Sequence, residues 1–362
     1  TFYKFSVTDF MENQNQTPHK RRVRYKGKYP KKFEEKYKEL QPEKYKDTIE
    51  HVIQKGNTPA GMHISIMVKE ILDFLNIQPG ETGFDATLGY GGHTKAMLQC
   101  LNGKGHIYAT DVDPEESAKT KKRLAEQGFG EELLTVKLQN FCTIDEIAKE
   151  VGGFDFILAD LGVSSMQIDN PKRGFSFKAD GPLDLRLNQE AGISAARRLD
   201  TISREELAGM LCENSDEPYC EELAKAITDE IRRGNHIDTT TKLRRVIEKT
   251  LDFLPEKEKK ETIKKTCQRT FQALRIDINS EFEVLYAFLD KLPGALKPGG
   301  RAAILTFHSG EDRLVKKAFK EGLKAGIYSE INQDVIRPSA EECAKNGRAK
   351  STKLRWAVKA QE

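Results

Sequence analysis

The chain has 362 residues and a formal net charge of +3, with 38% hydrophobic and 32% charged residues. This balance is typical of a water-soluble protein with an ordinary core, and at roughly 150 residues per domain it predicts two or three structural units. No apolar run approaches the about 18 residues of a membrane helix, and the N-terminus shows no secretory signal pattern. We therefore expect a cytoplasmic protein without membrane association. The six cysteines are scattered without a C-x-x-C pair, which predicts neither a disulfide framework nor a metal site.

The first part of the chain, residues 1–57, differs in composition from the rest. Between His19 and Lys38, lysines and arginines are dense and aromatic residues are interleaved with them. Such a segment is typical of a flexible arm that follows a nucleic-acid backbone by charge, and equally of a solvated tail with no partner. We predict that residues 1–57 form a basic extension outside the core, and the sequence leaves its role open.

From about residue 58, short apolar runs alternate with helical patterns. Strands are predicted at Thr82–Thr87, His106–Asp111, Leu134–Leu138, Phe154–Asp160, Arg301–Phe307 and Lys353–Lys359. Strand, helix and strand repeated at this spacing predict an α/β fold, in which helices cover both faces of a mostly parallel, Rossmann-like sheet.

A long insertion separates the fourth and fifth predicted strands. The segment from Asp160 to Arg301 is several times longer than the about 30 residues that one crossover ordinarily takes. Ser203 and Glu206 have the spacing of a capping box, and helical patterns follow at Pro218–Arg233 and Pro255–Leu274. We therefore predict a helical domain inserted at residues 170–275, which divides the α/β domain into residues 58–169 and 276–362.

A glycine-rich turn follows the first predicted strand and opens a helix, between Asp85 and His93. Glycines let a ligand approach the backbone, and a helix N-terminus offers free N–H donors. Ligands of such sheets bind at the carboxyl ends of the strands. Asp111 ends the second strand, where a carboxylate can accept both hydroxyls of a ribose. Asp113 is expected to cap the following helix.

Two cofactor classes share this arrangement. A dinucleotide site has the pattern G-x-G-x-x-G, but Thr94 stands where the third glycine is required when the motif is counted from Gly89. The acids at the ends of the first two strands suit S-adenosylmethionine, which presents an ammonium group and a ribose but no pyrophosphate. Asn140 and Phe141 follow the third strand, where the adenine is expected, and Asp160 ends the fourth. The residues therefore favour S-adenosyl-L-methionine.

Several longer motifs are more specific. They are GYGGH at 89–93, DLGVSSMQID at 160–169, RGFSF at 173–177, GPLDLR at 181–186, RTFQALRI at 269–276, FHSGEDR at 307–313 and NGRAKSTKLR at 346–355. Together, and in this order, they closely resemble the bacterial ribosomal RNA small-subunit methyltransferase H family. The resemblance covers the chain from about Gly61 to Trp356.

The resemblance implies a class I S-adenosylmethionine-dependent methyltransferase fold and N4-methylation of a cytidine in the decoding region of 16S rRNA. It implies a partner in the small ribosomal subunit and substrate recognition by the inserted domain, and it leaves open whether the protein is an oligomer. In that family the cofactor is held by the residues matching Gly91, Gly92, His93, Asp111, Phe141, Asp160 and Gln167. This chain departs from the family at Gly310, where leucine is usual, at Leu185, where methionine is usual, and in its longer basic arm.

Asp160 is the predicted catalytic residue. The exocyclic amine of cytosine is a poor nucleophile because its lone pair is conjugated into the ring. An acceptor against its N–H favours the geometry and charge of the reacting nitrogen, and alignment supplies much of the remaining acceleration. Asp160 is expected to orient the amine or border the methyl group, although a role in cofactor contact alone stays open. Ser164 and Ser165 are candidates for further hydrogen bonds to substrate, or ordinary turn residues.

The target base must leave its stack to reach such a pocket. Arg173, Phe175 and Phe177 are suited to stacking an unpaired base, and the alternative is that the two aromatic rings fill the interface between insert and sheet. His308 and Arg313 follow the fifth strand and are candidates for contacts to substrate or phosphate. A strand-end histidine, however, often makes only a local hydrogen bond.

A basic stripe for phosphates is predicted near the C-terminus, formed by Lys350, Lys353 and Arg355. The alternation of the last strand places its apolar residues inward and its basic residues outward. An exposed edge strand has the same pattern, so both interpretations stay open here.

Two rival functions remain at this point. One is a methyltransferase of the same fold that acts on a small molecule or a protein, and the basic and aromatic content around the insert favours RNA over it. The other is a non-catalytic RNA-binding protein, for which we expect Gly91 or Asp111 to be lost, whereas both are present.

Overall fold

The computed structural model divides into two units, Thr1–Met62 and His63–Glu362. The structure is described here for residues 65–361, which belong to the second unit. The basic extension predicted at residues 1–57 lies outside the described residues. Within the described part, no helix is long and apolar enough to cross a membrane.

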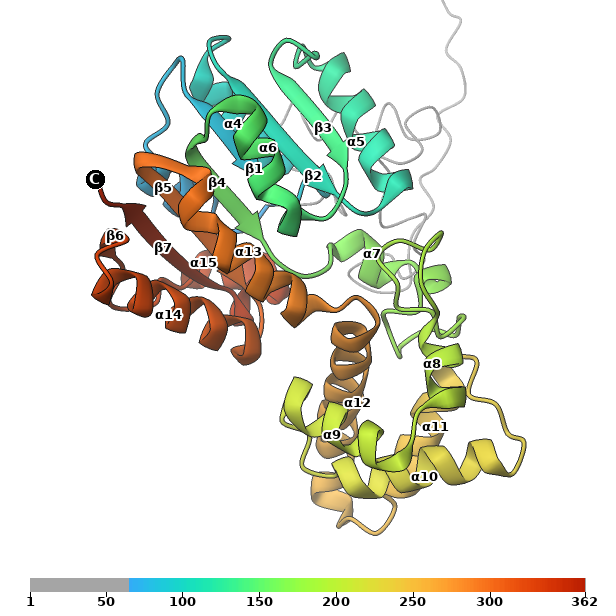
Figure 1. The fold of residues 1–362 in the computed structure, drawn as a ribbon. Coiled ribbons are helices and arrows are strands. Elements are labelled where there is room, and N and C mark those ends of the chain that lie inside the picture. The colour runs from blue at the N-terminus through green and yellow to red at the C-terminus, as the bar shows by residue number, and fades with distance from the viewer. Residues whose placement is uncertain (1–64, 362) are drawn as a thin grey trace, which may run out of the picture. The chain divides into compact units, whose positions relative to one another are not determined.

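The described part of the chain contains a seven-stranded sheet in the order β3-β2-β1-β4-β5-β7-β6. The strands are β1 (Thr82–Asp85), β2 (His106–Asp111), β3 (Leu134–Leu138), β4 (Phe154–Asp160), β5 (Leu296–Thr306), β6 (Tyr328–Ile331) and β7 (Lys353–Lys359). Strands β1 to β5 pair in parallel, and β7 runs antiparallel to both β5 and β6. The predicted strands and the α/β fold class are thus confirmed, with the helices flanking the sheet in Figure 1.

One strand was missed in the sequence. β6 spans only four residues, of which the middle two are exposed, and it lies at the edge of the sheet. So short a segment carries no alternation that distinguishes it from a loop.

The strand order reverses at β1, which pairs with β2 on one side and with β4 on the other. In open parallel sheets, the loops that follow two such strands diverge and leave a crevice at their carboxyl ends. Asp85 ends β1 and aligns with Ala109 of β2 and with Leu158 of β4. The topology therefore brings the loops after β1, β2 and β4 together at one edge.

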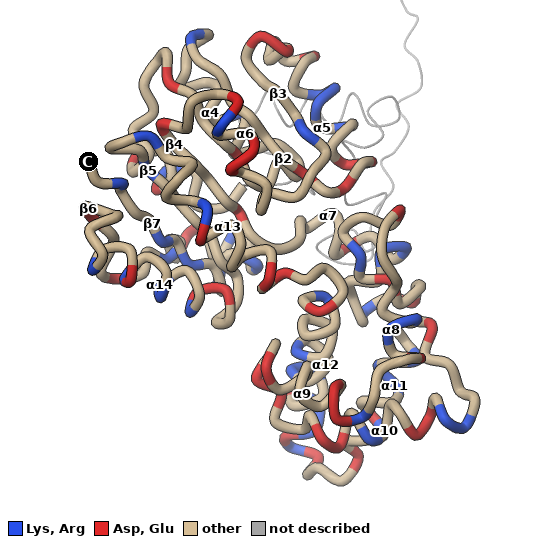
Figure 2. The backbone as a smooth tube through the Cα atoms, in the orientation of Figure 1, with Lys and Arg blue, Asp and Glu red and all other residues tan. Residues whose placement is uncertain are grey.

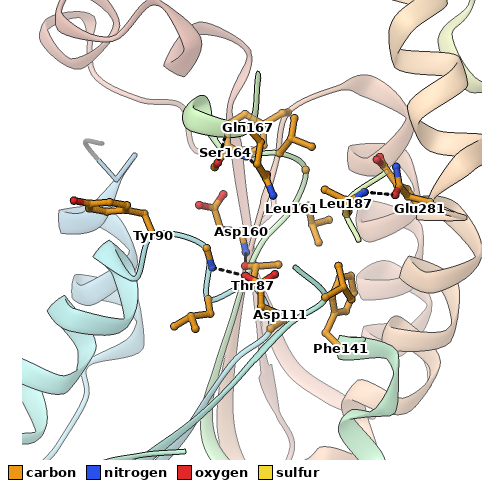
Figure 3. A pocket seen from close by; sticks show the side chains of 18 of the residues that line it. Thr87, Tyr90, Asp111, Phe141, Asp160, Leu161, Ser164, Gln167, Leu187 and Glu281 are labelled. Atoms are coloured by element: carbon orange, nitrogen blue, oxygen red, sulfur yellow. Dashed lines mark hydrogen bonds between the residues drawn. The ribbon is translucent and has the colours of Figure 1, made fainter. Parts of the chain in front are cut away.

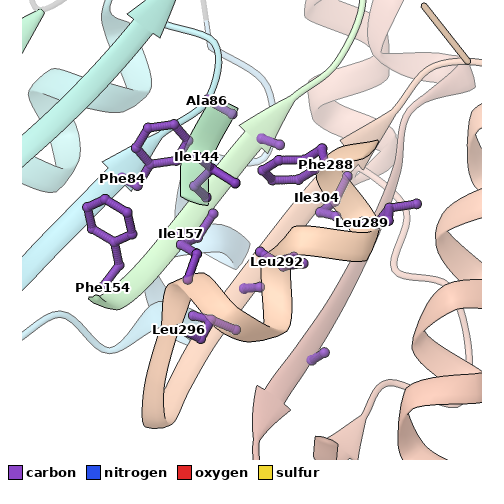
Figure 4. Close-up of a cluster of buried hydrophobic side chains, with 14 of the residues drawn as sticks. Phe84, Ala86, Ile144, Phe154, Ile157, Phe288, Leu289, Leu292, Leu296 and Ile304 are labelled. Carbon is purple, nitrogen blue, oxygen red and sulfur yellow. The ribbon is translucent and has the colours of Figure 1, made fainter. Parts of the chain in front are cut away.

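Two apolar layers cover the sheet, because its central strands are buried on both faces. Ile157 of β4 belongs to one layer, with Phe84 and Phe288, and its neighbours Phe156 and Leu158 belong to the other. Figure 4 shows part of the first layer, where Phe288 and Leu292 of α13 lie over the strands. The helices on this side are α6 (Ile144–Val151), α13 (Glu281–Ala295) and α14 (Ser309–Lys324), and those on the other are α3 (Val68–Leu75), α4 (Gly92–Leu101) and α5 (Pro114–Glu126).

A third apolar cluster is formed by the helices of the insertion. These are α8 (Ala195–Thr201), α9 (Arg204–Ser215), α10 (Cys220–Arg232), α11 (Thr240–Thr250) and α12 (Glu256–Ile278). The helices predicted at Pro218–Arg233 and Pro255–Leu274 are confirmed as α10 and α12. Ser203 accepts a hydrogen bond from the backbone of Glu206, as a cap does, whereas the Glu206 carboxylate pairs with Arg198.

Candidate active site

A cavity of about 350 Å³ opens at the carboxyl edge of the sheet. Figure 3 shows Asp160 near its centre, between Tyr90 and Glu281. The residues that line it include Gly89, Gly91, Gly92, Asp111, Asn140, Phe141, Asp160, Ser164, Ser165, Gln167, Leu187, Arg275, Asn279, Glu281, Phe307, Asn346 and Arg348. The cavity therefore joins loops after β1, β2, β3 and β4 to the junction of α12 with α13 and to the segment that precedes β7.

The glycine-rich turn contributes bare backbone to the cavity wall at Gly89, Gly91 and Gly92, beside the Tyr90 side chain. Gly91 has a φ of 79°, and a Cβ there would come within 2.7 Å of the Thr120 side chain. A Cβ at Gly92 would lie only 1.9 Å from the Ser65 hydroxyl. The positive φ and the packing against Thr120 therefore favour glycine at Gly91, and the N-terminus of α4 opens onto the cavity beside it.

Asp111 is held by the backbone of two loops. Its Oδ2 accepts from Gly89 N at 2.8 Å and its Oδ1 from Asp113 N at 2.9 Å. Burial nevertheless raises the pKa of Asp111 to about 6, because desolvation of the carboxylate outweighs these hydrogen bonds. A diol that donates to this carboxylate would replace part of the lost hydration, so Asp111 is suited to the ribose position predicted for it.

Asp85 does not face the cavity, although its position at the end of β1 predicts that it should. The carboxyl group is buried beneath the turn, where it accepts from Thr94 Oγ1 at 2.6 Å and from Thr87 N at 3.1 Å. Burial raises its pKa above the ordinary value. Asp85 thus anchors the first turn of α4 and is not among the residues that line the cavity.

His93 lies behind the cavity wall. Its Nε2 is 2.9 Å from Ile66 O, and its Nδ1 is 3.3 Å from Asp160 Oδ2. Because both ring nitrogens face acceptors, the ring makes both contacts only as an imidazolium. Burial lowers the pKa of His93, but the hydrogen bond and charge of Asp160 outweigh burial and raise it above its usual value. The His93 side chain therefore supports Asp160, and of this residue only the backbone remains available to a cofactor.

The Asp160 carboxyl group has one oxygen without a partner. Its backbone N donates to Thr87 Oγ1 at 2.8 Å, and its Oδ2 faces His93. Oδ1 is buried and has no hydrogen-bond partner among the described residues. Since buried acceptors are nearly always satisfied, Oδ1 is the unsatisfied acceptor of a residue that lines the cavity.

Phe141 and Gln167 border the same cavity from opposite loops. Phe141 begins the short helix η2 (Phe141–Thr143), and its ring meets Phe288 edge-on at 5.1 Å between centroids. Gln167 lies in α7 (Ser165–Asp169), where it forms a reciprocal capping box with Ser164. The Gln167 Nε2 also donates to Asp113 at 3.1 Å. Ser164 is therefore a helix cap as well as a lining residue, and Ser165 lines the cavity beside it.

The predicted base-stacking group has a structural role instead. Arg173 is buried, and its guanidinium donates to Asp113 Oδ2 at 2.7 Å. Phe175 is buried in the insertion cluster, and the Phe177 ring packs edge-on against Phe271 at 5.7 Å. The prediction of a stacking platform is wrong, because both rings pack with the apolar cluster of the insertion rather than with the two clusters that cover the sheet. Adjacency of arginine and aromatic residues in sequence does not determine which way they face.

The predicted basic stripe is also interrupted. Arg355 is buried, and together with Lys353 it pairs with Asp312 of α14, at 2.6 and 3.1 Å. The expectation that Arg355 points outward is wrong, because a buried carboxylate on the covering helix draws it inward. Lys350 is exposed in η4 (Gly347–Ser351).

The two candidates after β5 each lie near a carboxylate, His308 within its own helix turn and Arg313 across to the insertion. His308 caps α14, and its Nε2 lies 3.2 Å from Glu311 Oε1, which is the local alternative expected for a strand-end histidine. Arg313 is exposed, and its guanidinium lies 3.5 Å from Asp216.

The wall at the junction of α12 and α13 was missed in the sequence. Arg275 Nε donates to Glu281 Oε1 at 2.7 Å, and both line the cavity with Asn279. Ligand atoms of Glu281, His308 and Glu311 also lie within 4.8 Å of one another. Arg275 neutralises Glu281, and Phe307 N donates to Glu311 at 2.9 Å, so we assign no metal to this cluster. Arg275 lies in a family motif, but no sequence signal places it at the edge of the sheet.

Comparison with known proteins identifies the family. A family model described as the MraW methylase family matches residues 60–360. A protein of Agathobacter rectalis named ribosomal RNA small subunit methyltransferase H 1 is 83% identical over 95% of this chain and 98% of its own length. A relative of the same name from Lachnoclostridium phytofermentans is 71% identical, over 96% of this chain and 95% of that one. A ribosomal RNA small subunit methyltransferase H of Acidobacterium capsulatum is 38% identical, over 82% of this chain and 98% of its own length. These matches confirm the resemblance, and the chain belongs to the MraW methylase family of methyltransferases.

Proposed function

We propose that the protein transfers a methyl group from S-adenosyl-L-methionine to N4 of a cytidine in the decoding region of 16S rRNA. The observation that carries this proposal is the unpartnered, buried Oδ1 of Asp160, a residue that lines the cavity together with the predicted cofactor residues. The relatives named as ribosomal RNA small subunit methyltransferases support the substrate class.

The residues present fit the cofactor. Asp111 is placed for the ribose hydroxyls, Phe141 for the adenine, and the bare turn at Gly91 and Gly92 for the methionyl carboxylate at the N-terminus of α4. When bound, S-adenosylmethionine supplies an activated methyl group on its sulfonium. Gln167 closes the site from the loop after β4.

Asp160 performs the orienting step. Its Oδ1 accepts an N–H of the cytosine amine, which favours the pyramidal nitrogen and the positive charge that develops on it. Thr87 fixes the backbone of Asp160, and the His93 imidazolium fixes the other carboxylate oxygen. The carboxylate is thus preorganised, and the methylated amine later loses its proton to water without a strong base.

The RNA enters from the side of the cavity formed by the segment before β7. Asn346 and Arg348 line this side, and Lys350 is exposed next to them. Charge alone does not mark the RNA-binding face, since Figure 2 shows basic and acidic segments interspersed along α10, α11 and α12. We place the substrate within the small ribosomal subunit, and the reaction in the cytoplasm.

The test uses purified protein, a labelled methyl donor and small subunits that lack the modification. Nucleoside analysis of the rRNA is expected to show N4-methylcytidine at one position. Label on a protein, on a small molecule or on a ring carbon of cytosine contradicts the proposal. The same assay on naked 16S rRNA shows whether the assembled subunit is required.

A further inference from the structure

We propose that Asp113 and Arg173 form a positioning pair that ties the cofactor side of the cavity to the wall that carries Leu187. The pair would thereby hold the methyl donor and the target base in the relative position that methyl transfer requires. This inference rests on the proposed function, in which both ligands occupy the cavity. Asp113 and Arg173 do not themselves line the cavity.

The two carboxylate oxygens of Asp113 have separate tasks. Oδ1 accepts from Glu115 N and Glu116 N at 3.2 and 3.1 Å, which caps α5. Oδ2 accepts from Gln167 Nε2 at 3.1 Å and from Arg173 at 2.7 Å. A helix cap needs only the first oxygen, so the second oxygen serves the connection to the loop after β4 and to the insertion.

Asp113 also reaches the cofactor side directly. Its backbone N donates to Asp111 Oδ1 at 2.9 Å, and Gln167, which it orients, lines the cavity. Two of the residues predicted to hold the cofactor are therefore attached to Asp113. A shift of the Asp113 carboxylate would move the Gln167 amide with it.

Arg173 continues the connection to the opposite wall. Its second terminal nitrogen donates to Leu187 O at 2.7 Å and to Arg186 O at 3.2 Å. Leu187 N in turn donates to Asn279 Oδ1 at 2.8 Å, and both Leu187 and Asn279 line the cavity. A continuous series of hydrogen bonds thus connects Asp111, through Asp113 and Arg173, to the junction of α12 and α13.

The backbone held by this pair is unusual. Leu185 has a φ of 64°, in the left-handed region that a branched residue rarely adopts. Its N donates to Arg173 O at 3.1 Å, and its O accepts from Asn279 Nδ2 at 2.8 Å. Such a conformation persists only where its surroundings determine it, and it is common in functional walls.

Stability alone does not require a charged pair here. Replacing a buried ion pair by uncharged side chains is often neutral for stability, whereas removing one partner leaves a buried charge and destabilises strongly. This difference allows the positioning role to be separated from the structural one. Asp113→Asn keeps an oxygen for the cap of α5 but loses the acceptor for Arg173, and the double variant Asp113→Asn, Arg173→Met leaves no buried charge unpaired.

The experiment measures melting temperature, cofactor affinity by calorimetry, and kcat and KM for small subunits with each variant. Arg173→Met is expected to melt lowest, and the double variant to regain most of the melting temperature. We expect kcat to stay about 100-fold below the wild-type value in both, because misplacement of reacting groups by about 1 Å costs that much. Cofactor affinity is expected to fall less than kcat.

A matched control is the pair of Arg301 with Glu81, bonded at 2.8 Å near the opposite edge of the sheet. The double variant Glu81→Gln, Arg301→Met is expected to keep the wild-type kcat, provided that it melts above the temperature of the assay. Recovery of kcat together with melting temperature in the Asp113, Arg173 double variant overturns the positioning role. A wild-type protein that methylates no rRNA contradicts the proposed function itself, and with it this inference, before any variant is compared.

Discussion

His93 lies directly behind Asp160, with its Nδ1 3.3 Å from Asp160 Oδ2 and its Nε2 2.9 Å from the carbonyl oxygen of Ile66. One oxygen of Asp160 is thereby fixed, and the other remains without a partner in the described residues. The motif residue that the family resemblance assigns to the cofactor thus contacts, through its side chain, the carboxylate proposed to orient the target amine.

Replacing Asp160 by alanine should affect turnover more than cofactor binding. The variant loses the acceptor for the amine, and removal of one preorganised hydrogen-bonding group typically costs about 100-fold or more in kcat. Steady-state kinetics and calorimetry measure the two effects separately. Asp155→Asn is the control on the same strand, since Asp155 pairs with Lys297 near the opposite end of β4. Loss of cofactor affinity equal to the loss of kcat would show that Asp160 serves the cofactor alone.

His93 should make stability depend on pH. Because the pKa of His93 is raised in the folded protein, its contribution is fully present below the unfolded value of about 6.5 and is lost as pH rises through the folded pKa. The melting temperature of the wild type should therefore fall over that range. His93→Gln should remove this part of the dependence, and an unchanged profile in the variant contradicts the imidazolium assignment.

Asp111 should link cofactor affinity to pH. Ribose hydroxyls donate to the ionised carboxylate, and its pKa in the free protein is raised to about 6 by burial. Affinity is therefore expected to weaken by up to about tenfold per pH unit below 6, since the carboxylate must first lose its proton. Calorimetric titrations between pH 5 and 8 measure this effect, and Asp111→Asn should bind weakly at every pH.

The raised pKa of Asp111 should also make the stability of the ligand-free protein depend on pH. A folded pKa of about 6 above the unfolded value of about 3.9 means that stability is lost as pH rises through the folded pKa. The melting temperature of the wild type should therefore fall between about pH 4 and 6. Asp111→Asn, which does not titrate, should lack this part of the fall, and an equal fall in both proteins contradicts the prediction.

Lys350 and Arg355 should behave differently although they are close in sequence. Arg355→Ala breaks the buried pair with Asp312 and should destabilise by about 3 kcal/mol. Lys350→Ala should leave the melting temperature unchanged, weaken RNA binding and lower the salt slope by about one. Melting curves and RNA binding at several salt concentrations test both. Equal salt slopes for the two variants would restore the idea of a basic stripe.

The sequence by itself determined the sheet, its parallel strands and the residues at their carboxyl ends. Alternation and length identify a buried strand locally, and strand ends in a parallel sheet meet at one edge, so Gly91, Asp111, Phe141 and Asp160 line one cavity as expected. The sequence did not predict β6, because four residues at the edge of the sheet are too few to show an alternation of apolar and polar side chains.

Only the tertiary structure decided which side chains turn toward the cavity and which turn away. Arg173 and Arg355 carry sequence signals of a nucleic-acid contact, yet each is drawn inward by a buried carboxylate distant along the chain, Asp113 and Asp312. Conversely, Arg275 and Glu281 reach the cavity because α12 returns the insertion to the sheet. The physical reason is that a charged side chain is stable in a buried position only when a partner compensates its desolvation. Packing between distant segments, rather than neighbours in sequence, determines which partner that is.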